Sequence, residues 1–436
     1  MANLQAEAVA IDQTKPPLWF GATVLSHIRE YVPTIATEFS VLITQILVYK
    51  LAAYYLGKDG FSEYAVVRRA ATFLAPLPLV GLTVGLPRYI AISRCDGQHG
   101  KETQYFGAAL ACVLAATVLC LVILNAAAHP FSYLFFGDSN YARLIFPLSL
   151  MLFGLSIHTL VYAYFRGRLS MKSANILQLV NYASIPIVVF LFVGRHAERV
   201  LLWLGICWTS VAVVGLCFTP IGALLNFKAK QLRQLLRYGI QRVPGDFILM
   251  ALLSLPVIFV AHSAGMTMAG YVALGISVLS MIGALVTPIG LILLPKASSL
   301  LAMGKKSELR THVFHIVMLS LAVSGAASLV IWVFSHLLIQ LYLGPGFEQA
   351  AAILQVIVLG AVPYALFALL RNLIDAFHHN AVTALITAIS FVVFIAGVGI
   401  GRLYPAGGRE VLIALVVSLV FLGIAAGWEC VRILRC

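Results

Sequence analysis

The chain has 436 residues, of which 61% are hydrophobic and only 10% are charged. This composition excludes an ordinary soluble domain and is typical of a protein that crosses a membrane many times. The formal net charge is +13. Its distribution along the chain does not form the basic patch of a nucleic-acid-binding protein, so we expect a membrane partner and no nucleic acid.

Apolar stretches follow one another, with short loops between them, from about Tyr31 to Trp428. Each is long enough, at about 18–25 residues, to cross the ~30 Å hydrocarbon core as an α-helix. Helices are required there because every backbone polar group in hydrocarbon must be paired internally. We therefore predict an all-α polytopic membrane protein with about 12 transmembrane helices, at 31–52, 61–87, 103–124, 146–165, 174–194, 200–222, 238–261, 269–294, 312–334, 349–370, 381–401 and 410–428.

The loops are too short for a soluble domain, and their charge predicts the topology. The first 30 residues lack the basic start and the cleavage site of a signal peptide. The tails, the loops after even-numbered spans and the adjoining helix ends hold 20 of the 29 Lys and Arg residues, which places both termini in the cytoplasm. The predicted parts are a cytoplasmic leader 1–30, an N-terminal six-helix lobe 31–225, a basic cytoplasmic linker 226–237, a C-terminal six-helix lobe 238–428 and a cytoplasmic tail 429–436.

An internal repeat relates the two predicted lobes. Tyr31 and Tyr64 are 33 residues apart, and so are Tyr238 and Tyr271, at an offset of 207. Chance is the alternative explanation, since aromatic residues are common at the ends of spans. Six helices in each half make the repeat parallel, which is a known plan for transporters that rock two lobes around a central site.

Arg68 and Arg69 lie within the second predicted span. Ionisable residues at membrane depth are costly and mark a functional site by default. Adjacent helical positions point about 100° apart, so at least one arginine is expected to face the lobe interior, where its planar donors suit a phosphate. The alternative is that the span begins later and that both arginines are anchors at the membrane interface.

Span 7 contains Arg242 and Asp246, and span 1 contains Glu38. Arg242 and Asp246 are i,i+4 neighbours, so one interpretation is a structural ion pair. The alternative is that Arg242 binds the substrate while Asp246 exchanges an ion. Glu38 is a second candidate for ion coupling, with a salt bridge to a neighbouring span as the alternative. Arg371 and Asp375 after span 10 are interpreted as a solvated structural pair.

The sequence contains no motif of an enzyme, a nucleotide-binding domain or a metal site. Its seven cysteines include no CxxC pair and predict neither a disulfide framework nor metal binding. We therefore expect a transporter without catalytic residues, metal or cofactor.

The stretch from Leu56-Gly57 to Tyr64, followed by Gly85-Leu86-Pro87-Arg88, resembles spans 1 and 2 of the polysaccharide flippase family. Tyr238-Gly239 resembles the opening of span 7 in the same family. These flippases belong to the multidrug/oligosaccharidyl-lipid/polysaccharide exporter superfamily.

The resemblance implies two six-helix lobes in a V around a cationic cavity, in a bacterial inner membrane. The implied substrate is an undecaprenyl-pyrophosphate-linked oligosaccharide that is turned to the outer leaflet for surface polysaccharide such as O-antigen or exopolysaccharide. The cavity cations carried over from the family are Arg68 or Arg69 and Arg242. A polysaccharide polymerase and a chain-length regulator are the implied protein partners.

Two other functions remain open from the sequence. A cation-coupled multidrug exporter of the same superfamily favours an acidic, aromatic cavity, and Glu38 and Asp246 are the clear acids within the spans. A membrane polysaccharide polymerase or ligase needs a sizeable external loop with catalytic residues. The longest predicted external loop, at about 125–145, offers no paired motif.

Overall fold

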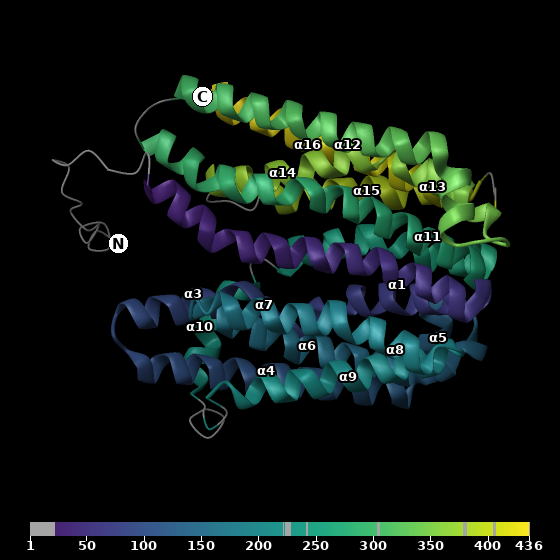
Figure 1. Ribbon diagram of the computed structural model, residues 1–436, viewed down its shortest axis with the longest axis horizontal. Coiled ribbons are helices and arrows are strands. Elements are labelled where there is room, and N and C mark those ends of the chain that lie inside the picture. The colour runs from purple at the N-terminus through teal and green to yellow at the C-terminus, as the bar shows by residue number, and fades with distance from the viewer. Residues whose placement is uncertain are drawn as a thin grey trace.

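The computed structural model consists of long α-helices that lie side by side in two bundles (Figure 1). The structure describes residues 22–220, 222, 228–240, 243–302, 306–377, 382–403 and 407–435. These residues contain helices and no strand, so the predicted all-α fold is confirmed.

The N-terminal half of the chain forms the bundle drawn in blue and teal, and α1 lies between this bundle and the other one (Figure 1). A 3-10 helix, η1, and a π-helix, η2, interrupt the α-helices. The elements are α1 Ala22–Leu74, α2 Pro76–Leu79, α3 Leu82–Cys95, α4 His99–Ala126, α5 Ala128–Phe136, η1 Ser139–Leu144, α6 Ile145–Gly167, α7 Met171–Leu179, η2 Val180–Ser184, α8 Ile185–Val193 and α9 Ala197–Cys217.

The C-terminal half forms the green and yellow bundle, preceded by a short amphipathic helix, α10, which packs against α3 and α4 of the first bundle. The elements are α10 Ala229–Ile240, α11 Val243–Ala302, α12 Lys306–Tyr342, α13 Glu348–Val358, α14 Ala361–Phe377, α15 Val382–Gly401 and α16 Arg409–Arg435.

Nine helical segments of the described chain are long and apolar enough to cross a membrane. Two of them, Val32–Leu79 and Val243–Val286, have 48 and 44 residues, over twice the ~20 needed for one crossing. Each contains a non-helical bend and so provides two spans. The broken pair α13 and α14, bent by 49°, adds one more. The described residues therefore account for the twelve predicted crossings.

The bends in α1 and α11 occur at Gly57 and Gly265, which have φ angles of 65° and 85°. Glycine adopts this left-handed region readily because it has no Cβ. The two glycines are 208 residues apart, one more than the offset of the tyrosine repeat. Corresponding turns therefore join the first two spans of each half.

Two predicted segments differ from the structure. The span predicted at 61–87 is broken, because α1 ends at Leu74 and α3 begins at Leu82. Pro76 and Pro78 lie at the break, where a proline cannot donate the backbone hydrogen bond that would continue the helix. The external loop predicted at about 125–145 also contains helical structure, in α5 and η1.

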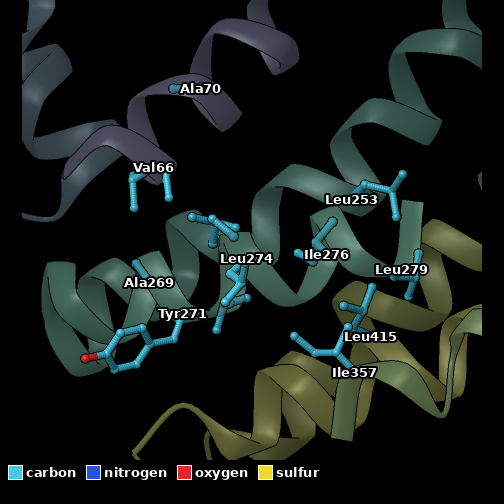
Figure 2. Close-up of a cluster of buried hydrophobic side chains, with 14 of the residues drawn as sticks. Val66, Ala70, Leu253, Ala269, Tyr271, Leu274, Ile276, Leu279, Ile357 and Leu415 are labelled. Atoms are coloured by element: carbon cyan, nitrogen blue, oxygen red, sulfur yellow. The ribbon is translucent and has the colours of Figure 1, made fainter. Parts of the chain in front are cut away.

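A cluster of apolar side chains joins α11 to its neighbours (Figure 2). Leu274 and Ile276 of α11, Ile357 of α13 and Leu415 of α16 are all at most 3% exposed. Gly275 allows α13 to approach, because a Cβ added there would lie 2.6 Å from Ile357 Cδ1. Val66 of α1 is also in this cluster, so the apolar contact continues from the second bundle into α1.

The outer faces of the bundles are apolar, as a surrounding bilayer requires. On α12, for example, Leu329, Val330 and Leu341 are 62%, 52% and 67% exposed. Hydrocarbon solvates such side chains, whereas water does not. The helices therefore build a multi-pass membrane protein.

Candidate functional site

Arg68 and Arg69 lie in the part of α1 that follows the bend at Gly57. This part packs along α11, and both arginine side chains are partly buried. Because adjacent helical residues project about 100° apart, the two guanidinium groups contact different sets of residues.

Arg68 points into the N-terminal bundle. Its Nη2 donates a hydrogen bond to Gln45 Oε1 at 2.5 Å, and its Nη1 donates to the Tyr64 hydroxyl at 3.1 Å. The guanidinium carbon lies 5.7 Å and 5.5 Å from the ring centroids of Tyr49 and Tyr64. These neutral partners orient the cation and stabilise it without cancelling its charge.

Arg69 reaches the other bundle. Its Nη2 donates a hydrogen bond to Ser277 Oγ of α11 at 3.2 Å. The hydroxyl of Tyr49 lies 2.8 Å from the same oxygen. Arg69, Tyr49 and Ser277 therefore form a polar link between the two bundles at the level of the spans.

No Asp or Glu within the described residues forms an ion pair with Arg68 or Arg69. A guanidinium stays charged when it loses water, and burial of an unpaired charge is costly. Two positive charges without an acidic partner among the described residues therefore lie on the part of α1 that packs along α11, and Arg69 is the one that reaches the other bundle. An anion with several oxygens, such as a phosphate, matches the planar donors of these side chains.

Asp246 lies in the first turn of α11 and forms an ion pair with Arg371 of α14. Arg371 Nε also lies 3.9 Å from Asp375 Oδ2, and Asp375 accepts a hydrogen bond from Thr383 of α15. The pair of Arg371 and Asp375 is present, as predicted. Arg242 lies outside the described residues, as does its predicted pairing with Asp246. Sequence spacing does not indicate the Asp246–Arg371 contact, because 125 residues separate the partners.

Glu38 is exposed on α1 and forms no ion pair with the described part of the chain. Arg166 of α6 lies within electrostatic range of its carboxyl group. The two candidates for ion coupling therefore differ among the described residues, since Asp246 has an arginine partner and Glu38 forms no ion pair there. Among the described residues, no group of three or more His, Cys, Asp or Glu side chains could hold a metal ion.

A buried polar cluster around η2 was not predicted from the sequence. Trp208 Nε1 donates a hydrogen bond to the Asn181 carbonyl at 2.7 Å, and Gln45 Nε2 donates to the Tyr182 carbonyl at 3.2 Å. Because Gln45 also accepts from Arg68, the cluster is continuous with the arginine site. π-Helical turns are frequent at functional sites. The feature of the sequence that could have indicated this cluster is a group of polar residues inside an apolar span.

The bundles also meet at the end of the molecule where α1 and α11 bend (Figure 1). A Cβ added at Gly270 of α11 would lie 2.4 Å from Ser62 Oγ of α1, so the two helices are in direct backbone contact. Nearby, Thr267 Oγ1 donates a hydrogen bond to Asp59 Oδ1 at 3.2 Å. We call these four residues the outer seam, because the topology predicted from the charge of the loops puts this end on the outer side.

Comparison with known families decides the assignment. The sequence profile of the polysaccharide biosynthesis protein family matches residues 34–301, more than half of the chain. The chain belongs to this family. The MatE family matches residues 245–398 of this polysaccharide biosynthesis protein, and no curated protein matches it in sequence. The two family matches assign the chain to the MOP superfamily and confirm the resemblance stated from its motifs.

Solved structures share the two-lobe fold at low sequence identity. An inward-facing multidrug resistance MATE family transporter of the MOP superfamily is 12% identical, with 92% of this chain and 99% of that chain covered, at a TM-score of 0.79. An outward-facing transporter of the same description is 14% identical, with 94% of this chain and 96% of that chain covered, at a TM-score of 0.65. The eukaryotic MATE transporter AtDTX14 is 12% identical, with 94% of this chain and 98% of that chain covered, at a TM-score of 0.66.

Proposed function

We propose that this member of the polysaccharide biosynthesis family is a flippase for a lipid-linked oligosaccharide. The observation that carries the proposal is the pair Arg68 and Arg69, which lies on the part of α1 that packs along α11 and has neutral hydrogen-bond partners. A lipid pyrophosphate carries negative charge that is costly in hydrocarbon. Two guanidinium groups offset that cost and bind phosphate oxygens through charge-assisted hydrogen bonds.

The neutral partners give the site a way to bind and release its substrate. A phosphate that approaches Arg69 replaces the hydrogen bond to Ser277, and one that approaches Arg68 replaces the bond to Gln45. Neither exchange breaks an ion pair, so the pyrophosphate does not compete with a protein carboxylate. Arg242 completes the proposed set of cations.

Alternating access follows from the two lobes. The lobes 31–225 and 238–428 rock as units, joined by the linker 226–237, with 1–30 and 429–436 as the tails. The substrate enters from the cytoplasmic side of a bacterial inner membrane, where we place both termini, and leaves after the outer seam opens. Glu38 and Asp246 couple the cycle to an ion gradient. A polymerase and a chain-length regulator then use the oligosaccharide for surface polysaccharide.

The second candidate is a multidrug exporter, which the MatE match over 245–398 favours. Exporters of cationic drugs need unpaired acids in the cavity. Glu38 fits this requirement, whereas Asp246 is neutralised by Arg371. Arg68 and Arg69, which have no acidic partner among the described residues, repel a cationic drug, and for this reason we prefer the flippase.

A strain that lacks the gene separates the two functions. The flippase predicts loss of surface polysaccharide and build-up of the lipid-linked precursor, with unchanged sensitivity to cationic drugs. Complementation with the wild-type gene should restore the polysaccharide. A strain with normal polysaccharide and increased drug sensitivity would refute the flippase and support the exporter.

A further inference from the structure

A pocket of about 510 Å³ lies in the N-terminal bundle, apart from the two arginines between the lobes. Its wall comes from α1 just after the bend, from η1 and from the turn between α8 and α9. The charged and titratable residues that line it are Glu63, Arg143, Arg195, His196, Glu198 and Arg199. Its volume is in the range of small-ligand sites, which is about 300–1,000 Å³.

One arginine, Arg143, forms ion pairs with both carboxylates of the pocket. Arg143 donates a hydrogen bond to Glu63 within an ion pair, and its Nε lies 3.5 Å from Glu198 Oε2. The three side chains form a network that fixes Arg143 in the wall. The acids of the pocket are therefore already engaged.

Arg195 and Arg199 have no such partner. Neither forms an ion pair or a side-chain hydrogen bond with the described part of the chain. Three arginines against two glutamates leave the pocket with one net positive charge when His196 is neutral. Arg143 with its two glutamates carries one net negative charge, so the positive excess comes from the two guanidinium groups at the turn before and at the start of α9.

This clustering runs against the distribution of charge along the chain. Only nine of the 29 Lys and Arg residues fall on the predicted outer side and its adjoining spans, and three of these line this pocket. Outer loops usually contain few basic residues. A local concentration of arginine there is consistent with an anionic ligand.

The pocket lies where two spans end. α8 ends at Val193 and α9 begins at Ala197, so the free arginines lie at the ends of two spans, where lipid headgroups are expected. Beside them, Phe192 and Trp203 are 84% and 47% exposed and offer apolar surface for acyl chains. Tryptophan is enriched at this depth because its ring is both apolar and a hydrogen-bond donor.

We propose that this pocket binds the phosphate headgroup of a lipid in the outer leaflet, through Arg195 and Arg199. Arg143 and its two glutamates form the fixed wall. Binding at this pocket is separate from the proposed transport and does not require it.

The test measures lipid binding to the purified full-length protein by native mass spectrometry after removal of bound lipid. The probes are phosphatidylglycerol, phosphatidylcholine and inorganic phosphate. The double variant Arg195→Gln, Arg199→Gln should bind phosphatidylglycerol about tenfold or more weakly, because it loses two charge-assisted contacts. The matched control is Arg402→Gln, Arg409→Gln, which removes two exposed arginines of the other bundle.

Glu198→Gln should change the affinity for phosphatidylglycerol in the opposite direction. It removes one acid from the pocket, so it should strengthen the binding of phosphatidylglycerol, which a partly unfolded variant would not do. Competition by inorganic phosphate at equal concentration would identify a soluble phosphate as the ligand in place of a lipid. An equal loss of phosphatidylglycerol binding in both double variants would overturn the proposal. So would a wild type that binds phosphatidylglycerol no better than phosphatidylcholine.

Discussion

Gly270→Ala tests whether the outer seam holds the two lobes in contact. Gly270 lies in the helical part of α11 with an ordinary negative φ, so alanine suits its backbone. The new Cβ would lie 2.4 Å from Cα, Cβ and Oγ of Ser62, whereas ordinary contact begins at 3.4 Å. The helices must therefore separate by about 1 Å at this point, since backbone atoms cannot give way as a flexible side chain does.

Overpacking of a close contact costs about 1–3 kcal/mol. If this cost falls on the closed seam and not on an open one, the ratio of molecules with an open seam to molecules with a closed seam rises roughly 5- to 150-fold. Alanine also favours the helix over glycine by up to about 1 kcal/mol, so general unfolding of α11 is not expected. Gly399→Ala in α15 is the matched control, because a Cβ there meets no atom within 4 Å.

The assay is a distance measurement by pulsed electron paramagnetic resonance. Spin labels at Ser139→Cys and Gln349→Cys, in a protein without its native cysteines, report on the outer ends of the two bundles, and both positions are exposed. Gly270→Ala should add a longer distance that the wild type and Gly399→Ala lack. A folded Gly270→Ala variant with the wild-type distance distribution would refute the role of the seam.

The remaining predictions concern the charged residues. The double change Arg68→Ala, Arg69→Ala should abolish surface polysaccharide while the amount of protein in the membrane stays normal; unchanged polysaccharide would make these arginines interfacial anchors. Glu38→Gln or Asp246→Asn should flatten the response of transport to an imposed proton or sodium gradient, and an unchanged response in both would place coupling elsewhere. Arg371→Gln should lower thermal stability by about 1 kcal/mol or less, because its pair with Asp246 is partly solvated. No loss in a melting experiment would show that this pair is not stabilising.

The sequence predicted the features that depend on local composition. Apolar length identified the spans, and the gaps between the predicted spans at residues 53–60 and 262–268 contain the bends at Gly57 and Gly265. The basic segment predicted at 226–237 overlaps the amphipathic helix α10. In each case, the signal is contained in about twenty neighbouring residues.

The contacts of the site depend on packing between distant segments. Arg69 and Ser277 are 208 residues apart, and their contact exists because α1 and α11 bend and cross. The i,i+4 spacing that pointed from Asp246 to Arg242 gave no information about Arg371 on another helix. Such partners require the three-dimensional structure.

Translocation by the purified protein in liposomes is the most direct measurement of the central claim. A fluorescent lipid-pyrophosphate-linked oligosaccharide is placed in one leaflet, and its arrival in the other leaflet is followed for the wild type and for Arg68→Gln, Arg69→Gln. We predict transfer by the wild type and transfer at the rate of empty liposomes for the variant. Equal transfer by the two proteins would contradict the role of the arginines, and no transfer by the wild type, with or without an ion gradient, would contradict the flippase itself.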